Sequence, residues 1–269
     1  MLPLLKVENL TKHYPARQRG RSNDKFAALD NMSLSIAPQT TVALLGESGS
    51  GKSTLALCVA CLESPTAGSI SFEGIDLTTL EENQLRLFRP QIQLVFQDPA
   101  RSLNPRWTAL DIVSEPFLIQ QRFTKPDRAV RALQLLDRVA IPRSMAGRTA
   151  AELSGGQKQR LAIARALALE PKLIILDEAL SALDCSVQAQ IANLLLDLQS
   201  SLGLTYLFIT HDFAMAAHFA DQVAVMDRGR IVESGPTHKI LFSPSHEATR
   251  SLLAATPNLA EPPGVLVAV

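Results

Sequence analysis

The nine residues at 46–54 constrain the fold more than any other stretch of the chain. They read Gly-Glu-Ser-Gly-Ser-Gly-Lys-Ser-Thr and fit the pattern G-x-x-x-x-G-K-[ST]. An apolar, β-branched run at 40–45 precedes them, and an apolar segment at 55–62 follows. In this order of strand, loop and helix, backbone N–H groups and the positive end of the helix hold a polyphosphate. A plain glycine-serine turn would not explain the strand before the loop or the Lys-Ser pair, so we expect nucleoside triphosphate binding.

The residues of this loop have separate predicted contacts. Lys52 reaches the β- and γ-phosphates, the Ser53 hydroxyl ligates Mg²⁺, and the glycines let the backbone turn tightly enough to aim its N–H groups inward. The predicted nucleotide-binding residues here are Gly46, Glu47, Ser48, Gly49, Ser50, Gly51, Lys52, Ser53 and Thr54.

Composition excludes several classes of protein. The chain has 269 residues, of which 46% are hydrophobic, enough for a packed core. Lys plus Arg and Asp plus Glu both total 26, so no net basic field points to nucleic acid. The N-terminus breaks its apolar run too early for a secretory signal, and no apolar run approaches the ~20 residues of a spanning helix. We therefore expect neither export nor a membrane crossing by this chain.

Three cysteines do not make a disulfide framework in a chain of this length, which agrees with a reducing cytoplasm. Cys58 and Cys61 form a C-x-x-C pair within the apolar segment after the loop, and Cys185 has no His or Cys nearby to complete a zinc site. The pattern favours small buried hydrophobic residues over a metal or redox site.

The remaining chain predicts two peripheral layers. Strands at 6–14, 28–37 and 69–72 indicate a small antiparallel β layer, and the polar stretch at 16–25 between the first two indicates a solvated loop. Tyr14, at the end of the first strand, is either a nucleobase-stacking aromatic or a half-buried strand residue. Helices predicted at 81–89, 109–121 and 127–140 include a helical insert, whose expected apolar positions are Leu110, Val113, Phe117, Val130, Leu133, Leu136 and Val139.

Three apolar strands deliver polar side chains to their carboxyl ends, where ligands sit in open α/β sheets. The strand at 92–96 is followed by Gln97, the strand at 173–176 by Asp177 and Glu178, and the strand at 205–210 by His211. Asp177 is suited to holding Mg²⁺ and Glu178 to orienting an attacking water. His211 is a candidate γ-phosphate contact, whereas His13, His218, His238 and His246 lack this context and are expected to be structural.

The segment at 153–157 reads Leu-Ser-Gly-Gly-Gln and precedes a predicted helix at 158–169. Serine and paired glycines at a helix start are typical of an anion site. Beyond it we expect a helix at 186–201, a closing hairpin at 223–233 and terminal helices at 236–242 and 246–255, followed by a fraying tail.

Together these motifs resemble the ATP-binding-cassette family. The resemblance covers about residues 5–253, and its most specific part is the Leu-Ser-Gly-Gly-Gln signature. It implies a P-loop NTPase, RecA-like α/β core with an antiparallel β subdomain and a helical subdomain at about 98–160, in a single ATP-binding domain with a tail at 254–269. ATP and Mg²⁺ are the implied cofactors.

The resemblance also implies residue roles. Lys52, Glu178 and His211 resemble the catalytic lysine, base and switch histidine. Tyr14 resembles the base-stacking aromatic, and the metal-holding residues would be Ser53, Gln97 and Asp177. The signature residues Ser154, Gly155, Gly156 and Gln157 would act on ATP bound by a second cassette, and 181–184 resembles the loop that couples the two sites through Asp184.

The stretches at 97–106 and 243–253 resemble the dipeptide, oligopeptide and nickel importer ATPases, although Glu247-Ala248 stands where that subfamily usually has Pro-Tyr. This implies transmembrane permease subunits, a second identical or homologous ATPase in a head-to-tail dimer, and, indirectly, an extracytoplasmic substrate-binding protein. The chain would lie peripherally on the cytoplasmic face of the cell membrane. Import of peptides, import of nickel or another metal, and a non-transport cassette ATPase are the alternatives.

Overall fold

The computed structural model describes residues 2–15 and 25–254 of the chain. The predicted polar loop at 16–24 and the tail from 255 onward lie outside the described residues. The strands are β1 (Leu5–Pro15), β2 (Lys25–Ile36), β3 (Thr41–Leu45), β4 (Ala67–Phe72), β5 (Ile75–Asp76), β6 (Ile92–Val95), β7 (Leu173–Asp177), β8 (Thr205–Ile209), β9 (Gln222–Asp227) and β10 (Arg230–Pro236). The α-helices are α1 (Lys52–Val59), α2 (Glu82–Phe88), α3 (Pro99–Ser102), α4 (Ala109–Ile119), α5 (Lys125–Arg138), α6 (Gly155–Leu167), α7 (Cys185–Leu202), α8 (Phe213–Phe219), α9 (Thr237–Phe242) and α10 (Glu247–Ala254).

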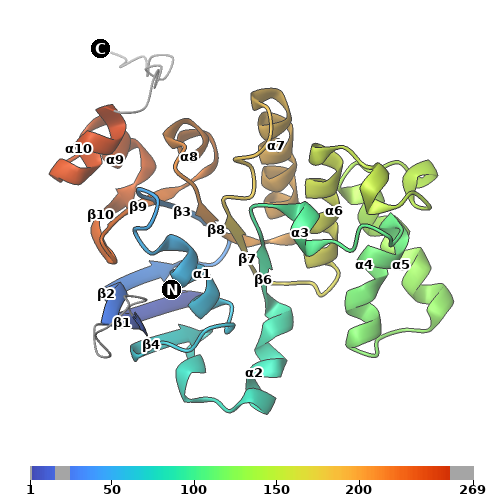
Figure 1. The fold of residues 1–269 in the computed structure, drawn as a ribbon, viewed down its shortest axis with the longest axis horizontal. Helices are drawn as coiled ribbons and strands as arrows, with labels where there is room; N and C mark the ends of the chain where they lie inside the picture. The colour runs from blue at the N-terminus through green and yellow to red at the C-terminus, as the bar shows by residue number, and fades with distance from the viewer. Residues whose placement is uncertain (1, 16–24, 255–269) are drawn as a thin grey trace.

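The described strands form two sheets. A six-stranded sheet has the order β10-β9-β3-β8-β7-β6, in which only β10 is antiparallel to its neighbour. A second, antiparallel sheet has the order β2-β1-β4-β5. Figure 1 shows this β layer at one end of the molecule and α4 and α5 at the other, with the parallel strands between them. The predicted α/β core with two peripheral layers is confirmed.

Successive side chains along the parallel strands point to opposite faces of the large sheet, and a hydrophobic core forms on each face. Ala43 and Leu45 of β3 join the cluster beneath α6, α7 and α8, whereas Val42 and Leu44 join the cluster beneath α1 and the β layer. Strands buried on both faces need no polar positions, which explains why their sequences are continuously apolar. Burial of this surface, at roughly 25 cal/mol per Å², is the main force that holds the layers together.

Two of the predicted positions were wrong. The strand predicted as buried at 92–96 ends at Val95 and is the edge strand β6, so Phe96 is 41% exposed. Val130, predicted to face the core of the insert, is 55% exposed because α5 buries Ala132 and Leu136 instead.

Several element boundaries also differ. The signature helix begins at Gly155, three residues before the predicted start, because Ser154 caps it. The sequence interpretation did not anticipate α3 and α8, which are short and lie directly after Gln97 and His211.

The three cysteines differ in exposure: Cys58 is buried, Cys61 is half-buried and Cys185 is exposed. Cys58 is buried in the core beneath α1, and burial raises the pKa of its thiol to about 11. A thiol with so high a pKa is a poor nucleophile and a poor metal ligand. No group of three or more His, Cys, Asp or Glu side chains suited to a metal occurs at residues 2–15 and 25–254.

Candidate active site

Four segments meet at the carboxyl edge of the parallel sheet. Gly46 follows β3, Gln97 follows β6, Asp177 ends β7, and His211 follows β8. Backbone bonds hold neighbouring segments together, since the Glu178 N–H donates to the Ile209 carbonyl at 3.0 Å and the Thr210 N–H to the Leu44 carbonyl at 3.2 Å. The sequence prediction that these side chains share one edge is therefore confirmed by the strand order.

The loop at 46–51 is fixed by close backbone contacts on two sides. A Cβ atom on Gly51, whose φ is +107°, would lie 2.2 Å from the Ala28 carbonyl oxygen of β2. A Cβ atom on Gly46 would lie 2.3 Å from the Met226 carbonyl oxygen of β9. The Gly229 N–H donates to the Ser50 carbonyl at 2.9 Å. These contacts leave Glu47, Ser48 and Gly49 as the exposed tip.

Lys52 lies inside this loop. Its ammonium donates to the carbonyl oxygens of Gly46 and Glu47, both at 2.8 Å, and the side chain is buried. Burial lowers the pKa of Lys52, while the carboxylates of Glu178 and Asp177 act in the opposite direction. A buried ammonium beside inward-facing backbone is placed to receive the charge of a phosphate group.

Asp177 and Ser53 form an oxygen pair across the edge. The Ser53 hydroxyl donates to Asp177 Oδ1 at 3.2 Å. Burial raises the pKa of Asp177, and the Ser53 hydrogen bond and the charge of Lys52 oppose that shift. A hydroxyl and a carboxylate side by side are the donor set that Mg²⁺ takes from proteins when phosphate oxygens complete its shell. These residues therefore fit the implied cation, and a bound cation would remove the electrostatic cost of the half-buried carboxylate.

Glu178 and His211 stand beside this pair. His211 Nδ1 lies 3.9 Å from Glu178 Oε1, with the His211 side chain 62% exposed and the Glu178 side chain 22% exposed. Gln97 is connected to Glu178 through Ser181, because Gln97 Nε2 lies 3.4 Å from Ser181 Oγ and that hydroxyl donates to the Glu178 carbonyl at 2.9 Å. Glu178 thus lies where its carboxylate could accept a proton from a water at the edge.

Tyr14 belongs to the β layer next to the loop. It pairs with Phe26 of β2, two residues from the Ala28 carbonyl that contacts Gly51. The Lys12 ammonium lies 5.1 Å from the Tyr14 ring centroid and is paired with Glu63 at 2.7 Å. A cation at this distance from the ring favours one orientation of the aromatic plane.

The signature forms a second cluster away from the loop. Ser154 caps α6, where its hydroxyl accepts from the Gln157 N–H at 3.3 Å and the Gln157 side chain accepts from the Ser154 N–H at 3.0 Å. A Cβ atom on Gly156 would lie 2.6 Å from Val187 Cγ1, so the start of α6 packs tightly on α7. Asp184 caps α7 by accepting from the Val187 N–H at 2.9 Å. No hydrogen bond or ion pair between described residues joins this cluster to residues 46–54.

The sequence interpretation missed three backbone contacts that shape the site. Ala28, Met226 and Gly229 form walls around the loop through their backbone atoms. One sequence signal could have indicated the contact with Gly229. The Asp-Arg-Gly turn closes the strand at 222–227, and that strand ends at the same edge of the sheet as β3. Backbone contacts of this kind leave no trace in side-chain patterns.

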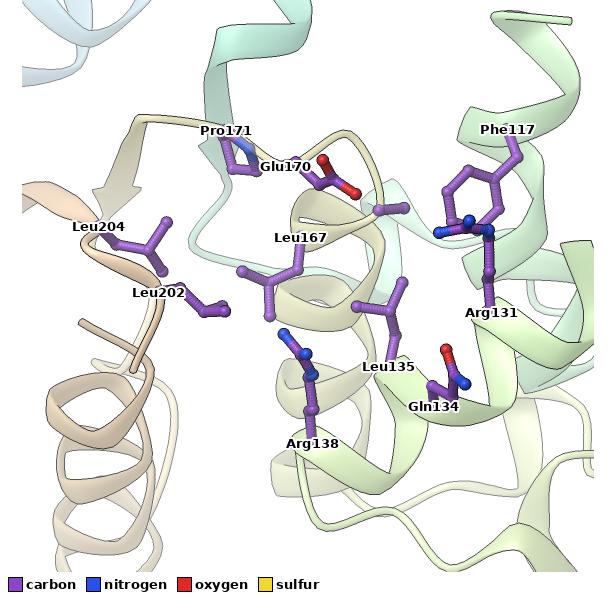
Figure 2. Close-up of a pocket in the computed structure, with 11 residues that line it drawn as sticks. Phe117, Arg131, Gln134, Leu135, Arg138, Leu167, Glu170, Pro171, Leu202 and Leu204 are labelled. Carbon is purple, nitrogen blue, oxygen red and sulfur yellow. The ribbon is translucent and has the colours of Figure 1, made fainter. Parts of the chain in front are cut away.

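The cavity shown in Figure 2 lies elsewhere. It has a volume of about 390 Å³ and lies between α5 and the segments that lead into β7 and β8, with Arg131 and Arg138 on one side and Leu202 and Leu204 on the other. None of the predicted site residues lines it.

Comparison with known proteins identifies the family. The ABC transporter model matches residues 29–181. The chain belongs to the ABC transporter family. It is 43% identical to the dipeptide transport ATP-binding protein DppF of Escherichia coli over 96% of this chain and 77% of that protein. It is 46% identical to the oligopeptide transport ATP-binding protein OppD of Mycobacterium bovis over 94% of this chain and 41% of that protein.

A solved ABC cassette has the same fold. The cassette MJ0796, determined as a dimer in a post-hydrolysis state with ADP and Pi, aligns with a TM-score of 0.77 at 33% identity, over 87% of this chain and 98% of that one. As a family member this chain is an ATPase of the transporter type, which confirms the predictions of fold, ATP binding and enzyme class. Within residues 2–15 and 25–254, no helix is long and apolar enough to cross a membrane.

Replacing the half-buried carboxylate of Asp177 tests what its charge costs the folded cassette. In Asp177→Asn we expect the nucleotide-free chain to gain about 1 kcal/mol of unfolding free energy at neutral pH, because the amide keeps the Ser53 hydrogen bond without a partly buried charge. Urea unfolding at a series of pH values measures this gain.

The raised pKa of Asp177 determines how the stability difference between Asp177→Asn and the wild type changes with pH. The folded wild type holds a proton more tightly than the unfolded chain, whose carboxyl has the ordinary pKa of 3.8. Wild-type stability therefore falls as pH rises from that value through the folded pKa, and the advantage of Asp177→Asn grows over the same interval. An advantage that is constant with pH, or a loss of stability, would show that burial does not penalise this carboxylate.

Proposed function

We propose that this ABC cassette powers a peptide importer by hydrolysing ATP between two cassettes. One observation carries the proposal. The phosphate loop, the acidic residues Asp177 and Glu178, and the side chains of Gln97 and His211 meet at one edge of the sheet, whereas the signature at the start of α6 lies away from that edge. One chain therefore offers two half-sites. A second chain, placed head to tail, supplies the missing half of each. The dimeric state of the MJ0796 structure supports this arrangement.

We further propose a role for each residue of the site. Lys52 and the N–H groups of 46–54 would bind the phosphates, with Tyr14 beside the base. Ser53 and Asp177, together with Gln97, would hold Mg²⁺, which supplies charge neutralisation on the phosphates. Glu178 would orient the attacking water and take up its proton, and His211 would contact the γ-phosphate. Ser154, Gly155, Gly156 and Gln157 would contact the ATP of the partner cassette, and Asp184 would link the two sites.

A groove beside Gln97 is the proposed contact with the permease. It has a volume of about 240 Å³ and is lined by β6, α4 and α6, with Phe96, Glu115 and Ile119 among its residues. Phe96 is 41% exposed and Ile119 is 68% exposed. Large apolar side chains gathered at the rim of a groove are typical of a protein interface. Closure of the cassettes would move this groove, and the motion would reach the membrane subunits.

This assignment places the chain peripherally on the cytoplasmic face of the membrane, with an extracytoplasmic substrate-binding protein acting through the permease. The cassette would span 5–253 and its helical insert about 98–160. The names of DppF and OppD favour peptide cargo. Nickel or another metal is the alternative cargo, because the permease and not this chain selects it.

An uptake experiment tests the proposal. Cells that carry either the wild-type chain or Glu178→Gln are given labelled dipeptide or labelled nickel, and the uptake of each is measured. We expect the variant to abolish dipeptide uptake and to leave nickel uptake unchanged. Loss of nickel uptake alone would reassign the cargo to a metal. If neither uptake changes, the chain is not the ATPase of either importer.

A further inference from the structure

The segment that follows Gln97 is tied to the signature helix by one arginine. Arg165 Nη1 of α6 donates to the Ser102 carbonyl at 2.7 Å. Ser102 is the last residue of α3, the single helical turn that begins two residues after Gln97. Of the hydrogen bonds between described residues, this is the one that joins α3 to α6.

The local setting makes this bond strong. Arg165 is one of the residues that line the groove next to Phe96, and burial lowers the pKa of its guanidinium while Glu115 acts in the opposite direction. Carbonyl groups in the last turn of a helix have no intrahelical partner, so a cationic donor satisfies one of them. Such charge-assisted bonds are roughly twice as strong as neutral ones, and the buried side chains of Ala162 and Ala166 lie on the same helix as Arg165.

The same helix carries the signature at its other end. Ser154 caps α6, and Arg165 follows eleven residues later, about 16 Å along the axis. The described α6 contains no proline, and its two glycines are both at its start. A helix of this kind moves as a unit, so a displacement at Arg165 is also a displacement at Ser154.

We propose that Arg165 is a positioning residue that transmits the movement of Gln97 to the signature. Gln97 would shift when its amide meets the nucleotide and cation, α3 would follow because Asp98 caps it directly after Gln97, and the Arg165 to Ser102 bond would pull α6. The inference rests on the proposed function of Gln97 and Ser154 and extends it to a residue that touches neither ATP nor cation.

A matched control exists on the same helix. Arg160 also donates to a backbone carbonyl, that of Val139 at 3.1 Å, but this bond ties α6 to the end of α5 and not to the segment after Gln97. Arg160→Met and Arg165→Met therefore both remove a bond from a guanidinium to a backbone carbonyl, and Arg160→Met also removes a second bond, from Arg160 Nη2 to Gln190 Oε1 of α7 at 3.5 Å. Arg165→Lys keeps the charge and a donor, so it tests rescue.

The experiment uses the full chain with Glu178→Gln, at a concentration where light scattering shows monomers, and fluorescent MANT-ATP with Mg²⁺. Binding of MANT-ATP is measured by titration. Hydrogen exchange is then followed at 97–103 and at 155–160, with and without nucleotide. We expect Arg165→Met to bind MANT-ATP within twofold of its parent and to retain the response at 97–103. The response at 155–160 should fall at least fivefold.

Arg160→Met should keep both responses, and Arg165→Lys should restore more than half of the lost one. An unchanged response at 155–160 in Arg165→Met, or an equal loss in Arg160→Met, would overturn the inference. A parent chain that binds MANT-ATP without any response at 155–160 would overturn it too. A parent chain that does not bind MANT-ATP would instead contradict the proposed function.

Discussion

In Glu178→Gln we expect ATP hydrolysis to fall by at least ~100-fold while ATP affinity stays within about twofold of the wild type. The carboxylate lies 3.9 Å from His211 Nδ1, and the Lys52 ammonium is held by the carbonyl oxygens of Gly46 and Glu47. An amide of the same shape keeps the packing but cannot accept a proton from water. Phosphate release by the purified membrane complex measures turnover, and MANT-ATP titration measures affinity.

Glu73→Gln is the control for this variant. Glu73 is paired with Lys172 at 2.7 Å and is exposed, so its substitution should leave turnover unchanged. Near-normal hydrolysis in Glu178→Gln would remove Glu178 from the mechanism, whereas an equal loss of ATP binding would indicate that its charge serves binding and not turnover.

Gly51→Ala is the second variant for which we expect a large effect, a loss of about 3 kcal/mol of unfolding free energy together with loss of ATP binding. The new methyl group would lie 2.2 Å from the Ala28 carbonyl oxygen and 2.9 Å from Met226 Cε, in a residue whose φ is +107°. The backbone of β2 cannot yield without disturbing its pairing with β1. Urea unfolding and MANT-ATP titration measure the two losses.

Gly74→Ala is the control that separates the steric clash expected in Gly51→Ala from the strain of a positive φ angle. Gly74 has a φ of +81°, and a Cβ atom there would meet nothing within 4 Å. We expect a cost of about 1 kcal/mol from the left-handed conformation alone, with ATP binding unchanged. Equal costs in the two variants would mean that the loop is not held against β2 as the structure indicates.

Much of the site could be predicted from the sequence, because the strands of a parallel sheet are recognisable as short apolar runs. The apolar runs before Gln97, Asp177 and His211 indicate strands of an α/β sheet, and parallel strands bring their carboxyl ends to one edge. The same reasoning wrongly predicted a fully buried strand before Gln97. That strand, β6, lies at the edge of the sheet, and strand order is set by long-range pairing that a local pattern does not encode.

Other features lay beyond local patterns. The close approach of Met226 and Ala28 to the loop depends on backbone atoms, and backbone atoms are the same in every residue. The separation of Ser154 from the phosphate loop depends on how α4, α5 and α6 pack beside the sheet. Arg165 looked like one of several helical arginines, and only its distance from the Ser102 carbonyl distinguishes it from Arg160.

The central claim is that one edge of the sheet binds ATP with a cation held by Ser53 and Asp177. Titration of ATP into the Glu178→Gln chain by calorimetry, with and without Mg²⁺, tests it most directly. The account predicts one ATP per chain, with affinity that rises when Mg²⁺ is present and loses that rise in Asp177→Asn. Absence of ATP binding, or binding that responds to neither Mg²⁺ nor Asp177→Asn, would contradict it.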